Sequence, residues 1–194
     1  MKTARATLLA LVLPASLAAQ QTPAAQANPI SQAFRARILN MHRNLAQAFD
    51  SIPEAKFSFK PTPAQQTVGF IAQHLANDNH LFCNQFGAMK QARTLKDSTT
   101  ADSVKATWPK DSLVAKMKES FAFCERALGQ LEDSKLAEQV TMTFGANSRQ
   151  FPRVSMVLGH ALDLADHYSQ IANYMRLNNM LPPTALPRAR PGGE

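Results

Sequence analysis

Residues 110–131, KDSLVAKMKESFAFCERALGQL, show the clearest helical pattern of the chain. Its apolar side chains follow one another at alternating steps of three and four residues: Val114, Met117, Phe121, Cys124, Leu128 and Leu131. Because an α-helix makes one turn in about 3.6 residues, these side chains share one face. A face of this width must be buried against other elements, so the stretch predicts an amphipathic helix inside a helical assembly.

Three further segments repeat this periodicity on either side of the first. Asn28 and Pro29 precede one of them as an N-cap and a first-turn proline, and Thr62 and Pro63 open another in the same way. No segment shows sustained β alternation. The predicted helices cover residues 29–52, 62–89, 110–131 and 152–179. Four amphipathic helices of this length predict an all-α four-helix bundle.

A long polar connection, residues 91–109, separates the second and third predicted helices. Its sequence, QARTLKDSTTADSVKATWP, contains one short stretch, 100–106, that can form a helical turn. Connections of this length in compact domains are often functional, although this one can also simply cover one end of the bundle.

The N-terminus has the pattern of a secretory signal peptide, residues 1–19. Lys2 and Arg5 precede an apolar run, and small residues follow it, so we expect cleavage after Ala18 or Ala19. The run is too short, and interrupted by Pro14, to span a bilayer. The mature protein is therefore expected to be periplasmic or secreted and not membrane-spanning. The predicted divisions are a signal peptide at 1–19, a flexible leader at 20–28, the bundle at 29–181 and a Pro/Gly-rich tail at 182–194.

The basic charge of the chain does not indicate a nucleic-acid partner. Loss of Lys2 and Arg5 with the signal peptide lowers the formal charge from +7 to +5. The remaining lysines and arginines are spread along the chain, whereas a nucleic-acid binder gathers them on one face.

The last predicted helix carries a polar stripe beside its apolar stripe. Asp163 and His167 lie four residues apart, so both side chains can reach one metal ion. His160 lies two turns from His167, about 10 Å along the axis, and would instead support the site or pair with Asp163. His74, in the middle of the second helix between apolar neighbours, is the best candidate for a third ligand.

Two cysteines, Cys83 and Cys124, lie on different predicted helices. In an exported protein they can form a disulfide, and they can equally remain as buried thiols. Cys83 is nine residues from His74 and faces another direction, so we do not expect it in the same site.

Several stretches together resemble the DinB-like superfamily: SIPEAKFSFKPTPAQQTVGFIAQHLANDNHLFC, ESFAFCERALGQL and LGHALDLADHYSQIANYMRLNNMLPP. The resemblance implies a bundle in which three histidines hold a divalent metal, one on the second helix and two on the last. His74 and His167 match two of these positions, whereas Asp163 stands at the third. Tyr168 and Gln170 are candidates to line such a site.

The resemblance leaves two hypotheses about function. In the first, an exported protein holds Zn, Ni, Mn or Fe at His74, Asp163 and His167 and acts as a metal-dependent hydrolase or transferase on an unknown small molecule. In the second, the bundle has lost its metal and serves as a non-catalytic binding or stress-related module, as a homodimer. Some members of the family are thiol-dependent transferases. His74 and His167 favour the first hypothesis, whereas Asp163 in place of a histidine and the lack of an evident nucleophile favour the second.

Overall fold

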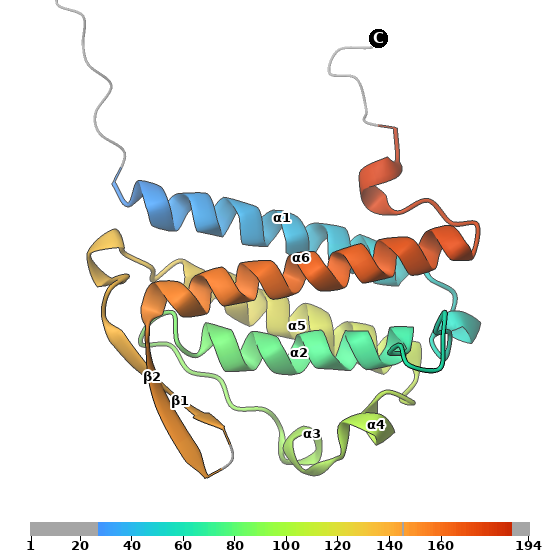
Figure 1. Ribbon diagram of the computed structural model, residues 1–194, viewed down its shortest axis with the longest axis horizontal. Helices are drawn as coiled ribbons and strands as arrows, with labels where there is room; N and C mark the ends of the chain where they lie inside the picture. The colour runs from blue at the N-terminus through green and yellow to red at the C-terminus, as the bar shows by residue number, and fades with distance from the viewer. Residues whose placement is uncertain (1–26, 145, 188–194) are drawn as a thin grey trace, which may run out of the picture.

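In the computed structural model, the apolar faces of four long helices meet along one axis. The structure describes residues 27–144 and 146–187. Figure 1 shows α1 and α6 lying side by side, with α2 and α5 beneath them. The helices of the bundle are α1 (Pro29–Ser51), α2 (Val68–Cys83), α5 (Lys110–Leu128) and α6 (Arg153–Leu177). The predicted all-α four-helix bundle is therefore confirmed.

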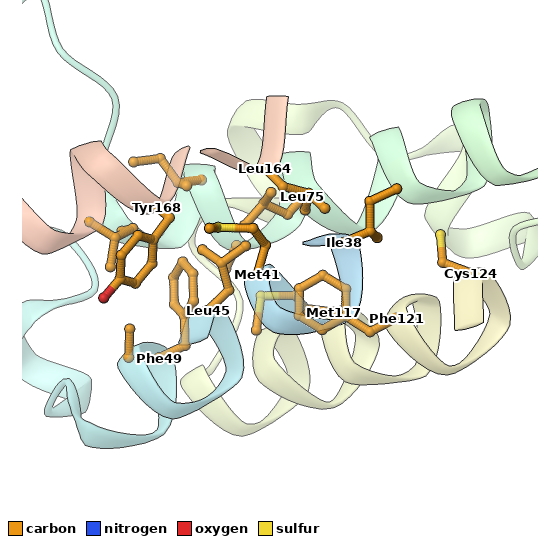
Figure 2. Packing of buried hydrophobic residues seen from close by; sticks show 14 of the residues in the cluster. Ile38, Met41, Leu45, Phe49, Leu75, Met117, Phe121, Cys124, Leu164 and Tyr168 are labelled. Atoms are coloured by element: carbon orange, nitrogen blue, oxygen red, sulfur yellow. The ribbon is translucent and has the colours of Figure 1, made fainter. Parts of the chain in front are cut away.

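The core fills the space between the four helices (Figure 2). α1 contributes Ile38, Leu45 and Phe49, each of which is fully buried. Across the axis, Leu75 of α2 and Leu164 of α6 are also fully buried. Burying one such aliphatic side chain stabilises the fold by about 1.5–3 kcal/mol, so these residues fix how the helices face one another.

The N-terminal ends of two helices differ from the prediction. α2 begins at Val68, later than Thr62, and Thr67 is its N-cap, because the Thr67 hydroxyl accepts a hydrogen bond from the Phe70 amide. Asn28 does not cap α1 through its side chain and adopts a left-handed backbone, with φ 56°. The carboxylate of Asp133 performs that role and accepts hydrogen bonds from the first amides of α1.

The long connection after α2 folds into two short helices, α3 (Leu95–Thr99) and α4 (Asp102–Lys105), that lie against the bundle (Figure 1). Lys105 is almost completely buried and holds this segment together. Its ammonium group lies 2.8 Å from the Asp102 carboxylate and 3.7 Å from that of Asp97. Charges this deeply buried are retained only when they are paired, so the connection has a defined conformation.

A β-hairpin precedes α6, although the sequence predicted no strand. β1 (Gln139–Phe144) pairs antiparallel with β2 (Asn147–Pro152) and extends away from the helices (Figure 1). In this hairpin Met142 is buried, whereas most neighbouring side chains are exposed. The remaining short elements are η1 (Glu54–Lys56), η2 (Asp133–Lys135) and η3 (Pro183–Ala185).

The predicted tail at 182–194 begins with an ordered turn. η3 packs beside the bundle, where the Tyr168 hydroxyl donates a hydrogen bond to Thr184 Oγ1 and accepts one from the Thr184 amide. The predicted signal peptide, nearly all of the leader and residues 188–194 lie outside the described residues. Among the helices that are described, none combines the length and hydropathy needed to cross a membrane.

Candidate metal centre

Two facing helices, α2 and α6, bring together the three residues proposed from the sequence. His167 Nε2 lies 3.3 Å from Asp163 Oδ1, and His74 Nε2 lies 4.0 Å from the same oxygen. The rings of His74 and His167 meet edge to face, with centroids 4.7 Å apart. One donor atom from each residue lies within 4.8 Å of the others, so the three side chains are near enough to serve as candidate ligands of one ion.

The polar atoms of this cluster are only partly satisfied by protein groups. Asp163 Oδ2 is buried and has no hydrogen-bond partner among the described residues. Burial alone would lower the pKa of His167, but the hydrogen bond and negative charge of Asp163 outweigh it and raise that pKa above its usual value. Asp163 thus presents Oδ1 to both imidazoles and leaves Oδ2 without a partner, and such a half-satisfied carboxylate fits a cation bound at this cluster.

Asp78 is a fourth member of the cluster that the sequence interpretation missed. Its Oδ2 lies 3.2 Å from His74 Nε2, one helical turn further along α2. Burial raises the pKa of Asp78 to about 6, and the nearby Asp163 carboxylate adds to this effect while His74 opposes it. The spacing of four residues between His74 and Asp78 was the available signal.

The residues predicted to support the site have three different positions. Gln170 is close, because its Oε1 lies 3.4 Å from His167 Nδ1 and can fix the orientation of that ring. Tyr168 lies within the hydrophobic core (Figure 2), and its hydroxyl donates a hydrogen bond to Thr184 instead. His160 is fully buried and lies beside Cys83 and the His42 ring.

Cys83 and Cys124 are joined by a disulfide, with Cα atoms 5.2 Å apart. This bond connects α2 to α5 and leaves no free cysteine in the part of the chain that the structure describes. As expected, Cys83 lies outside the His74 cluster.

A cavity of about 550 Å³ opens beside the cluster and is bounded partly by the long connection. His74 and Asp78 line it from α2, and Arg93 and Lys105 line it from the long connection. Arg93 donates a hydrogen bond to Asn77 on α2, which ties the connection to the helix that carries His74. The connection therefore covers the bundle and also shapes a space in which a small molecule could reach the candidate centre.

Comparison with known proteins identifies the class. The family model of the DinB superfamily matches residues 37–171, which include α2, α5, most of α1 and most of α6. The chain therefore belongs to the DinB superfamily. A search of functionally curated proteins found no match.

Solved structures of the same fold share little sequence with this chain. A DinB-like protein from Bacillus cereus ATCC 10987 superposes with a TM-score of 0.58 at 15% identity, covering 78% of this chain and 95% of its own. A conserved protein from Enterococcus faecalis gives a TM-score of 0.55 at 15% identity, covering 76% and 96%.

Mycothiol-dependent maleylpyruvate isomerase gives a TM-score of 0.58 at 12% identity, covering 73% of this chain. The match spans 60% of that enzyme's own length. At these identities, the likeness to all three structures concerns the fold.

Proposed function

We propose that this protein binds one divalent metal ion through His74, Asp163 and His167 and acts as a metal-dependent hydrolase or transferase. The observation that carries the proposal is the convergence of these donors from two helices, with Asp163 Oδ2 buried and unpaired. Within the described residues, neither Asp163 nor the neighbouring Asp78 has an ion pair with lysine or arginine.

The donor set suits a catalytic ion more than a structural one. Two imidazoles and a carboxylate leave coordination positions open, whereas structural zinc sites are closed by four protein ligands. Such an ion acts as a Lewis acid toward a substrate oxygen or lowers the pKa of a bound water or thiol. His74 is partly exposed, so the open side of the cluster faces the cavity bounded by Arg93 and Lys105.

The surrounding residues would position these ligands and the substrate. Gln170, anchored by its own hydrogen bond to Asp166, holds the far nitrogen of the His167 ring. Outer partners of this kind commonly affect metal affinity by about 10–100-fold. Arg93 offers a positive charge to an anionic substrate. One structural neighbour is a mycothiol-dependent isomerase, which supports a low-molecular-weight thiol as one co-substrate to test.

Metal analysis of the purified mature protein tests the proposal directly. We expect close to one Zn, Ni, Mn or Fe ion per chain by mass spectrometry of the metal content. His74→Ala and His167→Ala should each weaken binding by more than about tenfold, since even an outer-shell partner affects affinity to that extent. Added metal should raise the Tm of the wild type and not that of the variants.

His80→Ala is the matched control. His80 lies on the same helix six residues further on, but its ring stacks on Phe123 instead of facing the cluster. Its replacement should leave the metal content unchanged. A metal-free wild type whose stability does not respond to metal or to chelators would contradict the proposal and favour the non-catalytic module.

Export from the cytoplasm is part of the same proposal. Its support is the N-terminal sequence, residues 1–19, together with the Cys83–Cys124 bond, since disulfides persist in oxidising compartments.

A further inference from the structure

A second group of metal-ligating side chains lies deeper in the bundle, and each of the four bundle helices supplies one of them. His42 comes from α1, Cys83 from α2, Cys124 from α5 and His160 from α6. Cys83 Sγ lies 3.7 Å from His160 Nε2. Donor atoms of His42, Cys124 and His160 all lie within 4.8 Å of one another. The disulfide therefore sits directly against two imidazoles.

One nitrogen atom in each of these imidazoles lacks a hydrogen-bond partner among the described residues. His42 Nε2 and His160 Nδ1 are buried and have no hydrogen-bond partner among the described residues. His160 and both cysteines are fully buried, and His42 is nearly so. A buried unpaired polar group costs about 1–3 kcal/mol, so two of them side by side in an apolar core suggest a ligand that they bind in another state.

The histidines have the protonation state that a metal requires. Burial lowers the pKa of His42 to about 3 and lowers that of His160 well below its usual value, with the neighbouring imidazole adding to the effect. Both rings are therefore neutral at physiological pH, and metals bind the neutral form. Two neutral imidazoles and two sulfur atoms form the donor set of a tetrahedral zinc site.

We propose that reduction of the Cys83–Cys124 disulfide converts this cluster into a buried zinc site with His42, Cys83, Cys124 and His160 as its four ligands. Two molecules of a low-molecular-weight thiol would supply two electrons and two protons. They would become one small-molecule disulfide, and the protein S–S bond would become two thiols. Binding of Zn²⁺ would then release both thiol protons to water, so the bound ion carries two thiolates and two neutral imidazoles.

An ion can approach this cluster from the outer surface of α1 and α5. His42 lines a cavity of about 390 Å³ between these helices, together with Phe121 and Glu125. The His42 ring stacks on Phe121, with centroids 4.1 Å apart, and the His160 ring lies on its inner side with a centroid distance of 5.8 Å. His42 therefore lies between the cavity and the buried disulfide.

Cobalt and zinc titrations of the reduced protein test this site separately from the first one. The His74→Ala/His167→Ala variant removes the first centre and is reduced with a phosphine, which does not itself supply thiolate ligands. We expect one Co²⁺ per chain with a sulfur-to-cobalt charge-transfer band and the intense d–d absorption of tetrahedral cobalt. Zn²⁺ should displace it with release of two protons. The oxidised protein, which has no thiolates, should show neither signal.

Two variants identify the ligands, with circular dichroism as the check on folding. Cys83→Ser should remove the charge-transfer intensity in part, and His42→Phe, which keeps the aromatic stack, should weaken Zn²⁺ binding by more than about tenfold. A folded, reduced protein that gives no tetrahedral cobalt spectrum would overturn the proposal. So would a reduced protein that loses its helical signal and does not recover it with Zn²⁺. Neither result bears on metal binding at His74, Asp163 and His167.

Discussion

Asp163 occupies the position at which the family resemblance implies a third histidine. Its carboxylate lies 3.3 Å from His167 and brings a negative charge that an imidazole would not. A divalent ion held by two imidazoles and one carboxylate keeps a net charge of about +1, compared with +2 for three imidazoles. In the proposed site a bound water would therefore be less acidified than in a three-histidine site, which would favour substrates that bring their own nucleophile, such as a thiol.

Acid sensitivity should follow from the buried histidines. The pKa of His42 is about 3 in the folded protein and 6.5 in the unfolded chain, so the unfolded state binds more protons between these values. Its contribution to stability is complete above pH 6.5 and is lost as the pH falls toward 3. Between pH 7.5 and pH 5, urea unfolding should show a loss of about 2 kcal/mol from His42 alone.

His42→Phe provides the comparison for this measurement. The variant keeps the stack on Phe121 and removes the titrating nitrogen. Burial, the main cause of the low pKa of His160, is present in both proteins, and so is Asp78. The wild type should therefore lose more stability on acidification than the variant. If the free energy of unfolding falls equally with pH in both proteins, His42 is already protonated or accessible in the folded state.

At the level of elements, the close approach of α2 to α4 depends on Gly69. A Cβ atom at this position would lie 2.3 Å from the backbone oxygen of Ala106 and 3.3 Å from that of Phe57. A backbone atom cannot shift without the rest of its segment, so Gly69→Ala should push α4 away from α2. We expect the free energy of unfolding, measured with urea, to fall by about 1–3 kcal/mol. Because α4 bounds the cavity beside His74, metal affinity should fall as well.

Gly159→Ala is the control for this prediction. Its Cβ would meet the Phe82 ring at 3.2 Å, and a side chain can shift by the small distance needed. The gain in helix propensity, about 1 kcal/mol, offsets that contact, so the free energy of unfolding should change little. Equal losses at both positions would mean that α2 and α4 are not held at this separation.

The elements differ in how well the sequence predicts them. The stripes of α1, α5 and α6 are long and regular, and these helices begin within a residue of the prediction. α2 was placed too early, because Thr62-Pro63 has the pattern of a cap and a first-turn proline, whereas the helix begins at Val68 with Thr67 as its N-cap. The hairpin was missed although Val140, Met142 and Phe144 alternate with polar residues in β1, because that pattern covers only six residues and β2 is mostly polar.

On the scale of the whole molecule, the disulfide is the one covalent link between described residues that are distant in sequence. It joins residues 41 positions apart, and closing a loop of this size in the unfolded chain corresponds to about 4 kcal/mol of stabilisation. Cys83→Ala/Cys124→Ala should lower the free energy of unfolding by up to that amount. Urea titrations with and without reductant measure it.

The response to reductant supplies the control. Wild-type protein should lose stability when reduced in the absence of zinc, whereas the double variant should be insensitive to reductant. An unchanged wild type would indicate that the two sulfur atoms are not bonded in solution.

The sequence alone allows one of the two proposed metal sites to be predicted and not the other. The first could be proposed because Asp163 and His167 share one helix at ligand spacing, and only His74 had to be added from another helix. In the second cluster each helix contributes a single residue, so no spacing along the chain reveals it. Such a group becomes visible only when the rotation and register of all four helices are known.

Covalent closure between α2 and α5 also decides how the chain would respond to tension. Pulling the two ends apart would draw out α1, α2, α6 and their connecting segments, whereas everything between Cys83 and Cys124 would be shielded from the force. With 41 residues of separation at about 3.3–3.6 Å each, the shielded length is roughly 140 Å. A reducing environment would release that length, so the extensibility of this polypeptide is set by the redox state of a single bond.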